Sequence, residues 1–108
     1  MEKSKVREIL EVELSKHAPF ENWHGITKEN INRFLVEPTA VTVDPDDLET
    51  SKRKMWVVLQ TENDIKKGYN IAYDFWQQHW AVIEYTGKEN EFVQITAEPT
   101  LAEALGSM

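Results

Sequence analysis

The runs Gly68-Tyr-Asn-Ile-Ala-Tyr-Asp-Phe-Trp76 and Trp80-Ala-Val-Ile-Glu-Tyr-Thr86 decide the fold of this chain, with Gln-Gln-His79 between them. Gly87-Lys-Glu-Asn-Glu91 then leads into a third run, Phe92-Val-Gln-Ile-Thr96. All three runs are rich in β-branched and aromatic residues, and turn-forming residues separate them. This pattern predicts three antiparallel strands joined as a meander.

The alternation of side chains along these strands predicts their register. A three-residue loop at Trp76–Gln78 places Ile71 opposite Ile83, and a loop at 88–90 places Ile83 opposite Ile95. All three isoleucines then lie on one face, which we expect helices to cover. Shifting the pairing by one residue would move half of the apolar set to the other face.

The rest of the chain supplies helices and further strands. We expect an amphipathic helix over 2–16 and a second helix over 28–36 with Thr27 as its N-cap. Strands are expected at 39–43 and at 55–59, the latter apolar on both faces, and a short helix follows Thr100. The sequence therefore predicts one α+β domain over residues 1–108. Its antiparallel meander of four to five strands packs against two N-terminal helices, with a short C-terminal helix.

Composition and charge narrow the function classes. The net charge of −7 disfavours nucleic acid and anionic membrane surfaces as partners, because both require a basic field. Residues 17–50 contain seven acids and two bases, which suits a basic protein partner. The chain has no cysteine, no long apolar run and no apolar segment of a signal peptide, so we expect a cytoplasmic location.

A protein-interaction surface is the first functional hypothesis. Its candidate residues are acids and tryptophans: Glu37, Asp44, Asp46, Asp47, Glu49, Trp76 and Trp80. Exposed tryptophans beside acids would mark a docking patch, whereas the commoner interpretation buries such large rings in the core. A non-catalytic adaptor or an inhibitor resembling an immunity protein is the function that this hypothesis predicts.

A small-molecule pocket between the sheet and the helices is the alternative, with Tyr69, Tyr73 and Tyr85 as its lining. Asp74 and Glu84 are either buried acids or ordinary surface groups, depending on what covers their face.

Enzymatic activity has the weakest support in the sequence, since no catalytic motif is present. The scattered histidines predict no metal site, the acids 44–49 do not match a calcium loop, and we expect no cofactor. The oligomeric state and the identity of any partner or ligand stay open.

Overall fold

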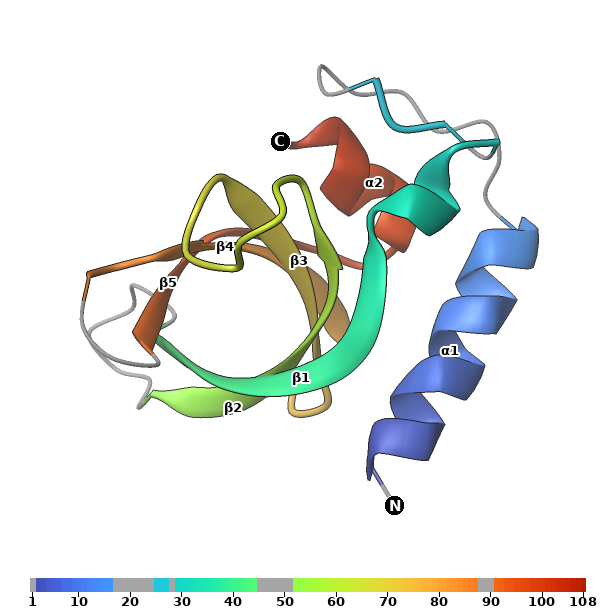
Figure 1. Cartoon of the computed structure of the whole chain (residues 1–108). Helices are drawn as coiled ribbons and strands as arrows, with labels where there is room; N and C mark the ends of the chain where they lie inside the picture. Colours follow the sequence, from blue (N-terminus) through green and yellow to red (C-terminus); the bar gives the residue numbers. More distant parts are fainter. Residues whose placement is uncertain (1, 17–24, 28, 45–51, 88–90) are drawn as a thin grey trace.

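The computed structural model describes residues 2–16, 25–27, 29–44, 52–87 and 91–108. These residues form the helices α1 (Glu2–Lys16) and α2 (Leu101–Gly106) and the strands β1 (Leu35–Asp44), β2 (Arg53–Gln60), β3 (Tyr69–Asp74), β4 (His79–Tyr85) and β5 (Glu91–Glu98). Consecutive strands pair antiparallel, as the meander predicts, and β1 also pairs with β5 in parallel. That last pairing closes the sheet into a barrel (Figure 1).

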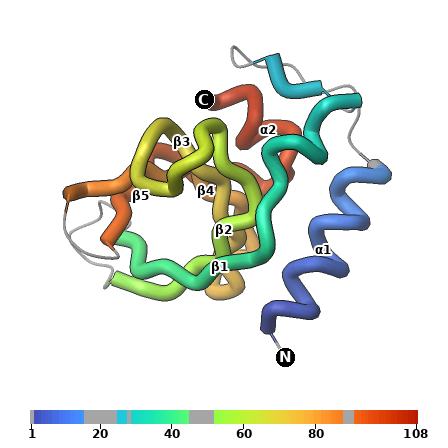
Figure 2. Tube along the Cα trace, in the orientation of Figure 1, coloured from blue at the N-terminus to red at the C-terminus, as the bar shows by residue number. Residues whose placement is uncertain are grey.

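Closure of the sheet depends on the long, curved strand β1. Figure 2 shows β1 bending around the barrel, from the side that faces α1 to the edge where it meets β5. Only the last part of β1 pairs with β5, through Thr42, Val43 and Asp44. An irregularity between Leu35 and Thr39 interrupts its pairing with β2. Pro38 lies in this irregular segment, where a residue without an N–H costs no regular ladder hydrogen bond.

The inside of the barrel is a small apolar core. Its centre is narrow, since Ala72 of β3 and Ala81 of β4 pair directly and are both fully buried. Small residues suit this place because five strands leave little room between their walls. The interior core comprises Val41, Val43, Met55, Val57, Ala72, Ala81, Ile83 and Phe92.

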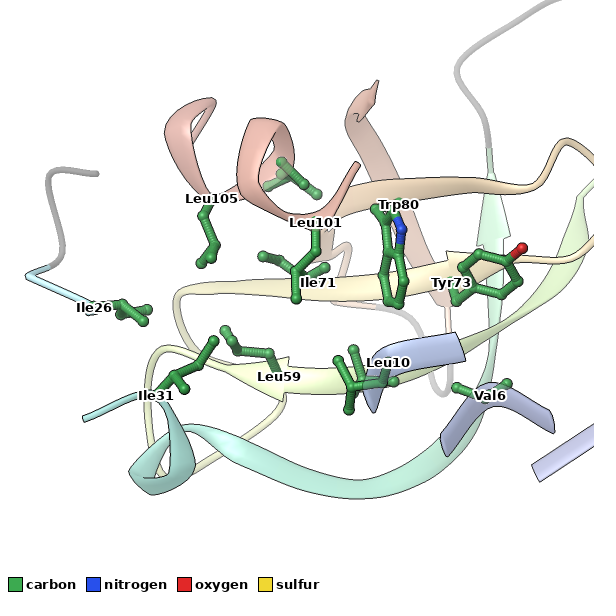
Figure 3. Packing of buried hydrophobic residues seen from close by; sticks show 13 residues of the cluster. Val6, Leu10, Ile26, Ile31, Leu59, Ile71, Tyr73, Trp80, Leu101 and Leu105 are labelled. Atoms are coloured by element: carbon green, nitrogen blue, oxygen red, sulfur yellow. The ribbon is translucent and has the colours of Figure 1, made fainter. Parts of the chain in front are cut away.

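A second core lies outside the barrel, under the helices. α1 contacts β1, β2 and α2, while α2 contacts β4 and β5. Figure 3 shows Val6 and Leu10 of α1 and Leu101 and Leu105 of α2 directed toward Ile71 and Trp80 of the sheet. Both faces of β3 and β4 are therefore buried, one inside the barrel and one under the helices.

Besides the strands of the meander, three further predicted elements are confirmed. α1 has the predicted bounds, and β2 is a central strand whose residues 57–59 are fully buried. α2 is capped as expected, since the Thr100 side chain accepts a hydrogen bond from the N–H of Glu103. Its inner face is made of Leu101, Ala104 and Leu105.

The prediction of a second N-terminal helix over 28–36 is wrong. Over the described residues 29–36, the chain forms a short 3₁₀ turn at Ile31–Arg33 and then enters β1 at Leu35, which pairs with Leu59. The Thr27 side chain accepts from the Asn30 N–H and the Asn30 side chain accepts from the Thr27 N–H, but the turn begins at Ile31 with Asn30 as its N-cap, so Thr27 is not the N-cap of a helix. Pairing with β2 extends the strand backward over residues of helical spacing, so tertiary contacts override the local pattern.

The predicted register is also wrong, by one residue. Ile71 pairs with Val82, and Ile83 pairs with Asn70 and Gln94. Ile83 therefore points into the barrel instead of toward the helices. Ile95 falls at an irregularity in the pairing of β4 with β5 and is 49% exposed.

Burial of both strand faces explains the error in register. A one-residue slip exposes apolar side chains only when one face of the strand meets water. Here the register of β3 against β4 depends instead on the turn that joins the two strands. The turn contains four residues, 75–78, between the paired residues Asp74 and His79. The Trp76 N–H donates to the Asp74 side chain, and Gln78 adopts a left-handed φ of 56°.

Candidate functional site

The turn between β3 and β4 exposes the largest apolar side chain on the described surface. Trp76 is 80% exposed, whereas its neighbour Phe75 packs against the outer core. The Phe75 ring lies edge-on to Tyr73, with 5.0 Å between the ring centroids. The turn therefore places one aromatic ring on the core and directs the next into solvent.

Asp74 anchors this turn to the barrel wall. One of its carboxylate oxygens accepts the Trp76 N–H at 2.9 Å, and the other accepts from Arg53 Nε at 2.9 Å. Asp74 is almost fully buried, and the Arg53 side chain is largely so. Since Arg53 begins β2, the carboxylate connects the Trp76 turn to the adjacent strand. Asp74 thus has a structural ion-pair partner.

The pairing of Arg53 with Asp74 was not predicted from the sequence. Arg53 lies two residues before Met55 and four before Val57, both of which point into the barrel. Strand alternation therefore gives Arg53 the same inward direction. A charged side chain at such a position requires a buried counter-ion. This requirement could have predicted from the sequence that Arg53 pairs with an inward-facing acid.

Trp80 does not share the exposure of Trp76. It is 1% exposed and packs against Tyr73, with ring centroids 4.8 Å apart. Trp80 pairs with Tyr73 across the strands, so both rings lie on the outer face that the helices cover. The structure thus separates the two tryptophans that the sequence grouped together.

The predicted acidic residues have different surroundings. Glu37 is exposed and lies between Lys3 and Arg7 of α1. A hydrogen bond from the Lys3 ammonium and the nearby Arg7 charge lower the pKa of Glu37. Asp44 ends β1 and is half-buried. The remaining candidate acids, Asp46, Asp47 and Glu49, lie outside the described residues.

The basic run that follows the acidic segment binds acids elsewhere in the chain. Lys52 donates to Glu91 at 2.8 Å, Arg53 pairs with Asp74, and Lys54 Nζ lies 3.1 Å from a carboxylate oxygen of Glu2. The hydrogen bond and charge of Glu91 raise the pKa of Lys52, with a smaller contribution from Asp44. Among the described residues, the ion-pair partners of Arg53 and Lys54 are Asp74 and Glu2.

The three candidate tyrosines do not surround one pocket. Tyr73 is buried in the outer core, and Tyr69 is partly buried and packs against the same core. Tyr85 packs against the interior core, on the opposite face of the sheet. The one-residue difference in register places Tyr85 there. Of the two acids left open by the sequence, Asp74 is buried and Glu84 is exposed.

Within the described residues, no group of three or more His, Asp and Glu side chains is arranged to hold a metal ion. In the same part of the chain, no helix has the length and apolar character needed to cross a membrane. Comparisons with protein-family models, with curated proteins and with solved structures found no match for this chain.

Proposed function

We propose that this domain is a non-catalytic protein-interaction module that binds a basic protein partner through Trp76. The exposure of Trp76 on an anchored turn is the observation that carries the proposal. Tryptophan is among the residues that contribute most binding energy when a partner covers them. Because Asp74 already fixes the turn, little conformational entropy would be lost on docking.

The charge of the chain indicates the chemistry of the partner. The net charge of −7 attracts a positively charged surface, and arginine or lysine on that surface can stack on an exposed indole ring. Among the described residues, Arg53 and Lys54 are paired with Asp74 and Glu2. The acids of the segment 45–51 contribute to the negative charge of the chain. That segment would then act mainly on the association rate.

The Trp76 contribution is tested by affinity capture from the native lysate followed by mass spectrometry. Wild type and Gln77→Ala should capture the same basic protein, and Trp76→Ala should lose it. The Trp76 side chain is exposed, so its removal should leave the urea midpoint unchanged. Gln77 is the matched control, because it is an exposed residue of the same turn. Equal capture by Trp76→Ala would contradict the proposal.

The electrostatic contribution is tested on the captured pair by stopped-flow kinetics. Neutralising Asp46, Asp47 and Glu49 with Asn, Asn and Gln should slow association at low salt and leave dissociation almost unchanged. Raising the salt to a physiological level should slow wild-type association steeply, since the screening length falls to about 8 Å. An association rate that responds to neither change would remove the acidic segment from the interaction surface.

A further inference from the structure

A recess of about 100 Å³ opens at one end of the barrel, apart from the Trp76 turn. The aromatic rings of Tyr85 and Phe92 contribute to its wall and contact each other edge-on, with centroids 5.4 Å apart. Ile65 and Lys66, from the connection between β2 and β3, line it together with residues 39–41 of β1. The recess has several times the volume that one water molecule needs.

Lys66 gives this apolar recess a positive charge. Its ammonium lies 5.5 Å from the centroid of the Tyr85 ring, at the distance of a cation–π contact. Among the described carboxylates, none forms an ion pair with Lys66. An anion that enters beside the aromatic wall could therefore pair with this ammonium.

The layer of side chains beneath the recess contains two buried oxygens that lack donors. Tyr85 pairs with Phe92, and two residues further along the strands Ile83 pairs with both Asn70 and Gln94. Two residues of strand separate these layers by about 6.6 Å. Asn70 Oδ1 and Gln94 Oε1 are buried and accept no hydrogen bond in the described structure.

Asn70 connects this deeper layer to the recess. Its Nδ2 donates to the backbone oxygen of Ile65 at 2.9 Å, and Ile65 lines the recess. The side-chain amide of Asn70 therefore contacts the backbone of a residue that lines the recess, and its oxygen belongs to the buried layer behind that residue. A buried acceptor without a donor costs free energy, so an N–H group that reached these oxygens would be stabilised there.

We propose that this end of the barrel binds a small carboxylate that carries a primary amide at its other end. The carboxylate pairs with Lys66, the short chain contacts Tyr85 and Phe92, and the amide N–H groups reach Asn70 Oδ1 and Gln94 Oε1. Entry to the deeper layer requires the side chains lining the recess to adjust. This site is independent of the proposed Trp76 interaction and takes a different class of ligand.

The test is an NMR titration of the isotope-labelled chain with three probes. Succinamate carries both end groups, succinate lacks the N–H donor, and butanamide lacks the carboxylate. Succinamate should give saturable shifts at Ile65, Tyr85, Phe92, Gln94 and the side-chain amide of Asn70. It should bind at least about tenfold more tightly than either other probe, because each lacks one hydrogen-bonding end. Equal binding of succinamate and succinate, or no saturable shift with any probe, overturns the proposal.

Two variants locate the groups that bind. Lys66→Met should weaken succinamate binding by about tenfold, whereas the matched control Lys67→Met, an exposed neighbour outside the recess, should not. Gln94→Leu should reduce the affinity for succinamate to that for succinate. The proposal is overturned if both lysine variants bind alike, or if Gln94→Leu changes only the unfolding midpoint.

Discussion

At the scale of single residues, Asp74 connects the core to the candidate interaction surface. One of its carboxylate oxygens accepts a hydrogen bond from the Trp76 backbone N–H, and the other accepts one from the Arg53 guanidinium. Removing one partner of a buried ion pair leaves the other charge in an environment that solvates it poorly. Removing one partner of a surface pair such as Lys52 and Glu91 costs much less stability, because water solvates the charge that remains.

We therefore expect Asp74→Asn to destabilise the fold by roughly 3–5 kcal/mol. The asparagine oxygen can still accept the Trp76 N–H, so this variant removes mainly the ion pair. The comparison is Lys52→Met, which should cost no more than about 1 kcal/mol. Urea unfolding of both variants measures the difference. Similar costs would show that the Asp74–Arg53 pair behaves as a surface pair.

At the scale of elements, α1 is attached to the barrel by its apolar face and by exposed ion pairs. Val6 and Leu10 are buried against the sheet. Near its start, Glu2 accepts a hydrogen bond from the Trp56 indole and pairs with Lys54, while Lys3 and Arg7 hold Glu37 of β1. The Trp56 hydrogen bond is the main cause of the lowered pKa of Glu2, followed by Lys54.

These lowered pKa values give a pH dependence with a definite sign. Both glutamates have a folded pKa below their ordinary value of 4.5, so their contribution to stability is present above that pH. The contribution is lost as the pH falls through the folded values. We expect the double variant Glu2→Gln, Glu37→Gln to be less stable than wild type at neutral pH.

This difference in stability should vanish in acid. Urea unfolding of wild type and the double variant at a series of pH values measures it. Because both carboxylates are exposed, added salt should reduce the neutral-pH difference as well. A stability difference that stays constant from neutral to acid pH would contradict the assignment.

At the scale of the whole molecule, closure of the barrel determines which residues form the core. The closed sheet buries Ile83 inside, while Ile95 lies half-exposed at an irregularity in β5. In the register predicted from sequence, both isoleucines would be neighbours on the helix-covered face. The two residues therefore discriminate between the observed and the predicted arrangement.

We expect Ile83→Ala to cost about 2–5 kcal/mol, because it removes a buried side chain and leaves a cavity. Ile95→Ala should change the free energy of unfolding far less, by about 0.5 kcal/mol, as surface substitutions usually do. Urea unfolding of the two variants gives the comparison. Equal and large costs would support the predicted register over the observed one.

The sequence by itself determined the elements whose signals are local. The alternating runs after Gly68 predicted β3, β4 and β5, the apolar run at 55–59 predicted the central strand β2, and Thr100 predicted the start of α2. Periodicity and capping act within a few residues, so a single chain carries them. The acidic balance and the candidate Trp76 were visible for the same reason.

Only the tertiary structure decided the register, the closure and the arrangement of the candidate sites. Both faces of β3 and β4 are buried, so the apolar pattern could not select a register, and the observed register goes with the four-residue turn 75–78. The parallel pairing of β1 with β5 joins segments nearly fifty residues apart in the chain, as in Val43 with Phe92. That closure brings residues of β1 beside Lys66 and Tyr85 at the recess, because contacts between distant segments depend on how all the strands pack together.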